Sequence, residues 1–282
     1  MISSNLNKKL KDLLLDRNCY NPATIFNPLS ARMAEQIGFK IGIVPGKIIS
    51  LDFLGDPDLM LLSLTELTET VRRIAKYAKI PLIVDADNGY GNAVNVCRTI
   101  ESLEDAGASG ISLEDTDLPI KFGKTKYPEF LSIKEATFKI KLAVDRKLNE
   151  STSIIARTGV YPYQGINAAL ERGKSYESVG ADALFYMNVS SKNDIEKLVK
   201  SHDIPIILGN NTTDLSLNEL TKMGISVSLP GHNAYFAAME AFRRSLENLY
   251  ETGEFSDLEI DINYINKLSN EEKNSEIIKK YM

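Results

Sequence analysis

The chain has 282 residues, of which 43% are hydrophobic and 25% are charged, a composition typical of a globular protein with one sizeable core. Lys and Arg total 33 against 38 Asp and Glu, so the formal net charge is −5 and no basic excess is available to bind nucleic acid or an anionic membrane. Apolar stretches such as residues 59–64 are far shorter than the roughly 20 residues that span a bilayer. We therefore expect neither a nucleic-acid partner nor a membrane partner.

The two cysteines, Cys19 and Cys97, have neither the spacing of metal ligands nor the number expected of an extracellular disulfide framework. Residues 1–20 alternate polar and apolar side chains instead of forming the apolar core of a secretion signal. Both features predict a protein of the reducing cytoplasm.

Short β-branched runs alternate along the chain with longer segments of helical apolar spacing. Strands are expected at residues 23–26, 40–44, 81–84, 110–113, 153–156, 183–186, 205–208 and 225–229. Helices are expected to begin near Pro28, Leu64, Asn92, Ser132, Gly165, Asn193, Leu215 and Asn233.

The predicted strands are uniformly apolar, which indicates a parallel sheet buried on both faces by helices. Eight strand–helix units favour an α/β fold of the (β/α)8 TIM-barrel type over an open sheet. The polar helical pattern from about residue 252 predicts a C-terminal helical extension. Since no Gly/Ser-rich linker or charge block interrupts the sequence, residues 1–282 are expected to form a single domain.

Carboxylates gather where the predicted strands end, which is where TIM barrels carry their active sites. The third strand runs into Asp85 and Asp87, which lie two residues apart and would face the same side of an extended chain. The fourth strand ends at Glu114 and Asp115, and the loop after the second strand adds Asp56 and Asp58.

Like charges that converge in this way repel one another unless a cation joins them. Oxygen ligands without nearby His or Cys favour a hard ion, so we expect Mg²⁺, although Mn²⁺ would also fit. The alternative for Asp85 and Asp87 is capping of the following helix or hydrogen bonding to the glycine-rich turn.

Two further side chains are candidates for substrate binding. Arg157 ends the fifth strand, where its guanidinium would grip a carboxylate or instead form an internal salt bridge to the acidic residues. His232 follows the eighth strand and is expected to face the site, with helix capping as the alternative. The other histidine, His202, precedes the seventh strand in a polar stretch and is expected to be solvated at the opposite end of the barrel.

The loop after the second strand presents Gly46 and the following backbone N–H groups, where an anion would be held. The chain lacks the P-loop pattern, and its Gly89-Tyr90-Gly91 segment lacks the third glycine of a dinucleotide fingerprint. Nucleotide binding is therefore not expected.

The segments Asp85-Ala86-Asp87-Asn88-Gly89-Tyr90-Gly91-Asn92, Leu113-Glu114-Asp115 and Ala156-Arg157 resemble the isocitrate lyase and phosphoenolpyruvate mutase superfamily. The resemblance covers nearly the whole chain. It is strongest to the oxaloacetate decarboxylase branch, through Glu114-Asp115-Thr116-Asp117-Leu118-Pro119 and Gly231-His232-Asn233-Ala234-Tyr235-Phe236.

This resemblance implies a Mg²⁺-dependent barrel that acts on 2-oxo or 2-hydroxy dicarboxylates, often as a tetramer whose last helix packs on a neighbouring subunit. It implies that Asp85 binds the metal directly and that Asp58, Asp87 and Glu114 hold metal-bound waters. It also implies that Arg157 and His232 contact the substrate, whose carboxylate binds the backbone N–H groups of Gly46, Lys47 and Ile48.

Departures from the family pattern narrow the expected chemistry. The Cys-containing loop of the lyases is replaced here by Pro119-Ile120-Lys121-Phe122-Gly123-Lys124, and the Asn of the mutase loop does not occur between Asp115 and Leu131. Carbon–carbon lyase and phosphonate-forming chemistry are both disfavoured. Lys47 stands where the decarboxylases carry Ser, which leaves the exact substrate open.

We expect decarboxylation of oxaloacetate, or of a close 2-oxo dicarboxylate, to pyruvate and CO₂ through an enolate that bound Mg²⁺ stabilises. The enzymatic alternative is a superfamily lyase of the methylisocitrate or alkylmalate type, or a phosphonopyruvate-processing enzyme. The other alternative is a dicarboxylate-binding protein without turnover.

Overall fold

A computed structural model describes residues 2–123, 128–255 and 260–282. The chain divides into two compact units, Met1–Gly231 and His232–Met282. The larger unit contains the whole sheet and the N-terminal helices, and the smaller unit contains the C-terminal helices.

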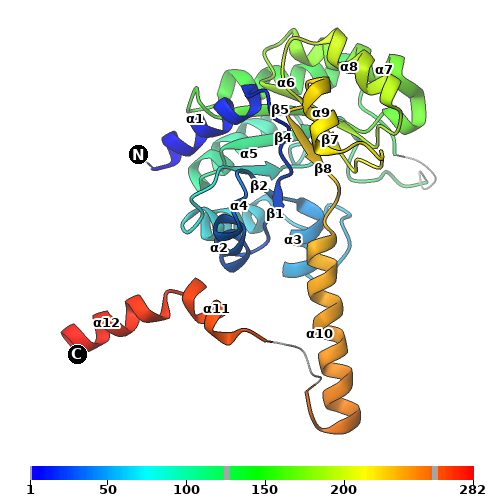
Figure 1. The fold of residues 1–282 in the computed structure, drawn as a ribbon. Coiled ribbons are helices and arrows are strands. Elements are labelled where there is room, and N and C mark those ends of the chain that lie inside the picture. The colour runs from blue at the N-terminus through cyan, green and yellow to red at the C-terminus, as the bar shows by residue number, and fades with distance from the viewer. Residues whose placement is uncertain (1, 124–127, 256–259) are drawn as a thin grey trace. The chain divides into compact units, whose positions relative to one another are not determined.

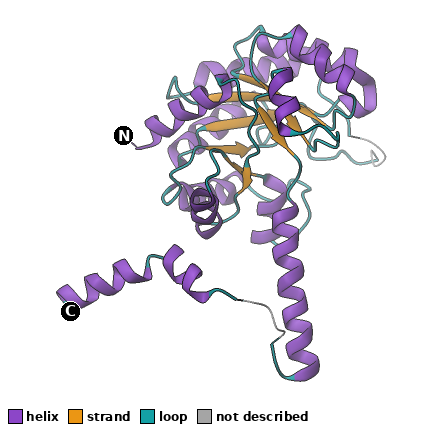
Figure 2. Cartoon of the chain, in the orientation of Figure 1, coloured by secondary structure: helices purple, strands orange, loops and turns teal. Residues whose placement is uncertain are grey.

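The sheet of the larger unit has eight parallel strands in sequential order, each hydrogen-bonded to the next (Figure 1). Tyr20, just before the first strand, forms a parallel bridge with Val227 of the last strand, which joins the two edges of the sheet. Helices surround the strands (Figure 2), so the predicted α/β barrel of the TIM type is confirmed. The strands are β1 (Ala23–Thr24), β2 (Gly42–Val44), β3 (Leu82–Asp85), β4 (Gly110–Glu114), β5 (Ser153–Thr158), β6 (Ala183–Met187), β7 (Ile206–Gly209) and β8 (Val227–Leu229).

The predicted helix after each strand is present, with starts close to those expected. Side-chain caps explain several starts, since Asn27, Ser63 and Asn92 each accept a hydrogen bond from a first-turn N–H group. The segment expected to begin near Gly165 starts one turn earlier, at Tyr161, and a kink at Gly165 (φ 78°) separates this first turn from the rest of the helix. These helices are α2 (Pro28–Ile37), α4 (Leu64–Ala75), α5 (Ala93–Ala106), α6 (Ile133–Arg146), α7 (Tyr161–Glu177), α8 (Lys192–Ser201), α9 (Leu217–Met223) and α10 (Asn233–Thr252).

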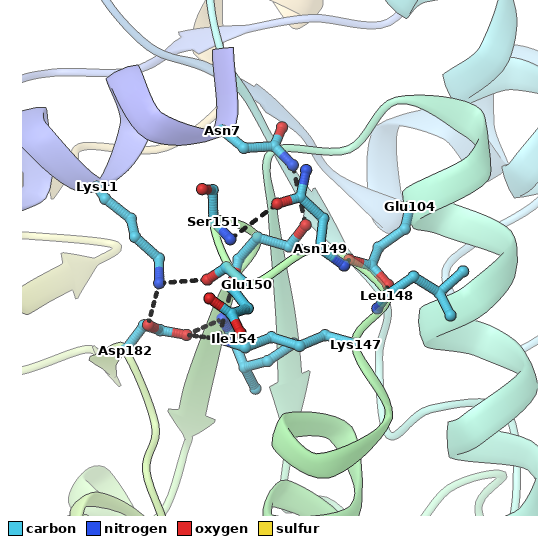
Figure 3. Close-up of polar contacts among 11 residues, drawn as sticks. Asn7, Lys11, Glu104, Lys147, Leu148, Asn149, Glu150, Ser151, Ile154 and Asp182 are labelled. Atoms are coloured by element: carbon cyan, nitrogen blue, oxygen red, sulfur yellow. Dashed lines mark hydrogen bonds and ion pairs between the residues drawn. The ribbon is translucent and has the colours of Figure 1, made fainter. Parts of the chain in front are cut away.

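The structure adds a helix at the N-terminus, α1 (Ile2–Leu15), which the sequence analysis did not anticipate. Its Leu10 and Leu14 pack against residues of the barrel interior, including Ile83 and Ile155. Figure 3 shows how its polar face is fixed at the start of β5. The amide of Asn7 donates to the Thr152 hydroxyl at 2.9 Å, and Lys11 donates to the Glu150 carbonyl and pairs with Asp182. The α1 helix therefore covers the end of the barrel at which the strands begin.

His202 occupies a different environment from the solvated one expected. Its imidazole has no exposed area, its Nδ1 lies 2.7 Å from a carboxylate oxygen of Glu177, and its Nε2 lies 2.8 Å from the hydroxyl of the buried Tyr186. The polar neighbours of His202 in sequence gave no sign of this, because both partners come from other elements. His202 therefore links α7 to β6.

We expect His202→Ala to lower the free energy of unfolding by about 3 kcal/mol, because a buried hydroxyl and a carboxylate oxygen each lose their partner. Urea denaturation measures this. The matched control, Lys200→Ala at an exposed position of α8, is expected to change stability by less than about 0.5 kcal/mol. Equal effects of the two substitutions would contradict a stabilising role for the buried network.

The smaller unit consists of α10, α11 (Ile262–Leu268) and α12 (Glu271–Tyr281), consistent with the predicted helical pattern at this end. The α10 helix ends at Gly253, whose left-handed conformation (φ 75°) suits glycine. Among the described residues, no helix has both the length and the apolar character needed to cross a membrane.

Candidate active site

Three neighbouring strands end in charged side chains that contact one another. Asp85 is the last residue of β3, Glu114 is the last residue of β4, and Arg157 lies near the end of β5. The Nη1 of Arg157 lies 2.8 and 2.7 Å from the two carboxylate oxygens of Asp85, and its Nη2 lies 2.9 Å from an oxygen of Glu114. The register of the parallel strands, which pairs Glu114 with Arg157, makes this contact possible. The predicted acidic cluster and the predicted arginine therefore meet, and they do so through the internal salt bridge considered as the alternative.

Asp87 belongs to the same cluster but reaches it differently from the prediction. The strand stops at Asp85, and Asp87 has a left-handed backbone (φ 47°), so the two residues do not alternate along one extended chain. The turn nevertheless keeps Asp87 at the barrel mouth, where it is 7% exposed. A Cβ added to Gly46 would lie 3.5 Å from both Asp87 carboxylate oxygens, so Asp87 approaches the second strand–helix connection closely.

That connection contains a short helix, α3 (Gly46–Phe53), where a loop was expected. Gly46 and Lys47 form its first turn, whose N–H groups have no acceptor within a helix and suit an anion. The N–H of Ile48, also predicted to bind the substrate, instead donates to the Pro45 carbonyl at 3.1 Å. The side chain of Lys47 is exposed, and its charge acts on Asp58 at the same rim.

Crowding of the acids changes their proton affinities. Burial, reinforced by the charges of Asp85, Glu114 and Asp58, raises the pKa of Asp87 well above its usual value. Burial also raises the pKa of Glu114 although Arg157 opposes the shift, and loss of hydration together with the charge of Asp85 raises the pKa of Asp58. In Arg157, burial lowers the pKa, but the charges of Asp85, Glu114 and Asp87 outweigh it and the net shift is upward. The carboxylates of the cluster therefore outnumber the positive charges that could neutralise them.

This charge imbalance predicts how the stability of the metal-free protein depends on pH. Since the folded pKa of Asp87 lies above its unfolded value of about 3.9, the folded state holds its proton more tightly. Stability is therefore expected to fall as the pH rises from about 4 through the raised pKa. In EDTA, the melting temperature of the Asp87→Asn variant should decrease less over this window than that of the unsubstituted protein. Parallel melting curves for the two proteins would contradict this prediction.

Asp115, which shares the end of β4, does not face the mouth. It is 2% exposed, and its Oδ2 accepts hydrogen bonds from Arg172 Nη1 at 3.0 Å and from the Tyr176 hydroxyl at 2.7 Å. Both partners come from α7, where they are four residues apart and lie on one face. Sequence reasoning missed Arg172, for which the only signal was a charged residue at an apolar position of the helical pattern.

The donor set at the mouth consists of carboxylate oxygens, which fits a hard divalent cation. Within the described parts of the chain, no group of three His, Cys, Asp or Glu side chains converges closely enough to enclose a metal ion. Mg²⁺ in proteins is commonly bound by one or two carboxylates, with water in its other positions. The predicted scheme, with Asp85 as the direct ligand and water-mediated partners, stays a prediction.

His232 opens the smaller unit at the N-cap position of α10. Its carbonyl accepts a hydrogen bond from the Tyr235 N–H at 3.1 Å. The capping alternative loses support, because among the described residues its side chain accepts no N–H of the first turn. Its contact with substrate stays a prediction.

Residues 10–250 match the family model described as phosphoenolpyruvate phosphomutase. The chain belongs to this family. The superfamily membership predicted from the strand-end motifs is therefore confirmed.

Curated relatives of known name are similar to this chain over most of their length. The chain is 40% identical to an oxaloacetate decarboxylase of Rhodopseudomonas palustris strain BisB18 over 82% of this chain and 81% of that protein. It is 38% identical to an oxaloacetate decarboxylase of Bradyrhizobium sp. strain ORS 278, over 85% and 83% of the two chains.

Solved structures with the same fold are also similar to this chain. A phosphonopyruvate hydrolase in complex with oxalate and Mg²⁺ has a TM-score of 0.88 and 28% identity, over 98% of both chains. An oxaloacetate acetylhydrolase in complex with the inhibitor 3,3-difluorooxalacetate has a TM-score of 0.87 and 27% identity, over 98% of this chain and 96% of that one.

Proposed function

We propose that this protein is an oxaloacetate decarboxylase that requires Mg²⁺, with Mn²⁺ as a substitute. The observation that carries the proposal is the contact of Arg157 with both Asp85 and Glu114 where three adjacent strands end. The relatives at 38 to 40% identity that are named for this reaction support it.

A count of charges at the mouth favours a divalent cation. Four carboxylates, those of Asp58, Asp85, Asp87 and Glu114, face two cations, Arg157 and Lys47. The excess of two negative charges matches one divalent ion. We assign Asp85 as its direct ligand and the other three acids as partners of its bound waters. When bound, the ion supplies Lewis acidity, which favours negative charge on the substrate's 2-oxo oxygen.

The protein's own groups would bind and orient the substrate and would support proton transfer. The first-turn N–H groups of Gly46 and Lys47 would bind a substrate carboxylate, and Arg157 would orient the substrate against the cluster. Cleavage of the bond between C3 and the C4 carboxylate releases CO₂ and leaves the electron pair on the enolate of pyruvate. His232 would bind the departing carboxylate or support protonation of C3.

The decisive experiment is incubation of the purified protein with oxaloacetate, with and without Mg²⁺, with lactate dehydrogenase and NADH to report pyruvate. A control with Mg²⁺ and no protein measures the reaction catalysed by the metal alone. Metal-dependent pyruvate formation well above that control is the expected result. Parallel assays with phosphonopyruvate and alkylmalates test the other chemistries of the superfamily, and turnover of one of these without oxaloacetate turnover would overturn the proposal.

We further propose a cytoplasmic homo-oligomer, with a tetramer as the family precedent. The α10 helix exposes Phe236, Met239, Phe242 and Leu246 at helical spacing, an apolar stripe that a second copy of the chain would cover. Light scattering coupled to gel filtration measures the number of subunits. A monomer at micromolar concentration would contradict this assignment.

Lys47 is expected to tune affinity for the substrate. Its exposed ammonium lies where the related decarboxylases are expected to carry Ser, and its charge already acts on Asp58. Lys47→Ser should raise the KM for a dianionic substrate by about tenfold with a smaller change in kcat, because a screened charge contributes mainly to binding. A matched control, Lys40→Ser at the opposite end of β2, should leave KM unchanged. An unchanged KM in Lys47→Ser would place this lysine outside substrate binding.

A further inference from the structure

A small cavity lies directly behind the acidic cluster. Its volume is about 10 Å³, the lower limit of the space needed to hold a single water molecule. Its walls come from the ends of β3, β4 and β5 and from α6 and α7, so it separates the barrel mouth from the buried Asp115 network. The polar residues that line it are Asn88, Glu114, Asp115, Lys139, Arg157 and Tyr176.

Three buried polar atoms on these lining residues have no hydrogen-bond partner among the described residues: Arg157 Nε, Asn88 Oδ1 and Asp115 Oδ1. The orientation of the Asn88 amide is defined, because its Nδ2 donates to the Leu118 carbonyl at 2.8 Å and Oδ1 must therefore accept. Asp115 already uses its other oxygen for Arg172 and Tyr176. Unpaired buried groups of this kind are costly, so a shared partner is expected.

Lys139, on α6, also lines this cavity. It is only 6% exposed, unusual for a lysine, and burial lowers its pKa while the charges of Glu135 and Asp117 act in the opposite direction. Its neighbours Lys134 and Lys141 on the same helix differ, since Lys134 is exposed and Lys141 pairs with Asp145 at the surface. Of the three lysines of α6, all within the described residues, Lys139 is the buried one.

We propose that the cavity binds one ordered water molecule, which accepts hydrogen bonds from Arg157 and Lys139 and donates to Asn88 and Asp115. Two donors and two acceptors satisfy all four hydrogen bonds of a water molecule. The terminal nitrogens of Arg157 contact Asp85 and Glu114. A hydrogen bond from its Nε to the water would also restrict the orientation of the guanidinium plane. Lys139 is thus a positioning residue. It donates a hydrogen bond to the water, and the water accepts one from Arg157, which would orient the substrate.

The effect on turnover rests on the proposed function, but the water site itself does not. A high-resolution crystal structure of the Mg²⁺-bound protein is expected to show one water within hydrogen-bond distance of all four groups. The same structure of Lys139→Met should show that water lost and the Arg157 side chain displaced. Direct contact of Lys139 Nζ with Asp115 Oδ1 and no water between them would overturn the proposal, whatever reaction the protein catalyses.

The kinetic test separates positioning from mere stability. Lys139→Met is expected to lower kcat/KM for oxaloacetate about tenfold, Lys139→Gln should restore part of it by keeping a donor, and the control Lys134→Met should match the unsubstituted enzyme. A variant that loses melting temperature but keeps kcat/KM would show Lys139 to be structural only and overturn its positioning role. If the unsubstituted enzyme turns over no oxaloacetate, the proposed function fails while the crystallographic result still decides the water site.

Discussion

Replacing Asp85 with asparagine is expected to abolish both the turnover of oxaloacetate and its dependence on Mg²⁺. Among the described acids of the cluster, Asp85 alone has both carboxylate oxygens within hydrogen-bond distance of the Arg157 guanidinium. The amide keeps the shape of the side chain but loses the charge that a hard cation requires. Loss of a direct ligand in such a site is expected to reduce kcat/KM by at least about a thousandfold.

The assay compares this variant with Asp12→Asn, which changes an exposed aspartate of α1 in the same chemical way. Mg²⁺ titrations followed by melting temperature provide a second readout, since an ion that binds only the folded state stabilises it. The control should keep both the activity and the stabilisation by Mg²⁺. Full activity in Asp85→Asn would remove Asp85 from the metal site and with it the central assignment of the proposed function.

The barrel was predictable because its determinants are local. A parallel strand buried on both faces is an uninterrupted apolar run, and Asn27, Ser63 and Asn92 mark helix starts by capping them. Since all strands of a parallel barrel end on one side, topology brings charged side chains at neighbouring strand ends close together. This made the meeting of Asp85, Glu114 and Arg157 predictable, whereas the inward turn of Asp115 was not.

The features that the sequence did not predict depend mainly on contacts between residues far apart in the chain. His202 lies in a polar stretch, and only Tyr186 and Glu177 from other elements make its site buried. The α3 helix was missed because Pro45 and Gly46 are typical of a turn and the following isoleucines favour a strand. Lys139 sits among exposed lysines of one helix, and nothing in its local sequence sets it apart.

Contacts between residues distant in sequence also form a second charged network, behind the cluster of Asp85, Glu114 and Arg157. Asp115 follows Glu114 in sequence but faces the other way, toward Arg172 and Tyr176. The strand end thereby connects the mouth to a buried network on α7. Changes to this second layer are therefore expected to alter the mouth through Arg157, not through direct contact with a substrate.

Arg157→Met is expected to have the largest effect on the stability of the metal-free protein. Among the described residues, Arg157 is the one cation that contacts two of the cluster's acids, and its removal leaves Asp85 and Glu114 with uncompensated charge in a partly buried site. Breaking a buried ion pair in this way typically costs about 3 to 5 kcal/mol. Urea denaturation in EDTA near neutral pH measures the loss, with Arg73→Met, an exposed arginine paired to Glu69 on α4, as the matched control.

Two further comparisons identify the cause. Mg²⁺ should restore more stability to Arg157→Met than it adds to the unsubstituted protein, because a divalent cation would supply the missing charge. Arg157→Lys should lie between the two, since an ammonium carries the charge but cannot contact both acids as the planar guanidinium does. Turnover of oxaloacetate should fall at least about a hundredfold in both variants, because each loses the geometry that orients the substrate. If Arg157→Met were as stable as the control and insensitive to Mg²⁺, the four acids would not act as one electrostatic cluster, and the argument for a divalent ion among them would fail.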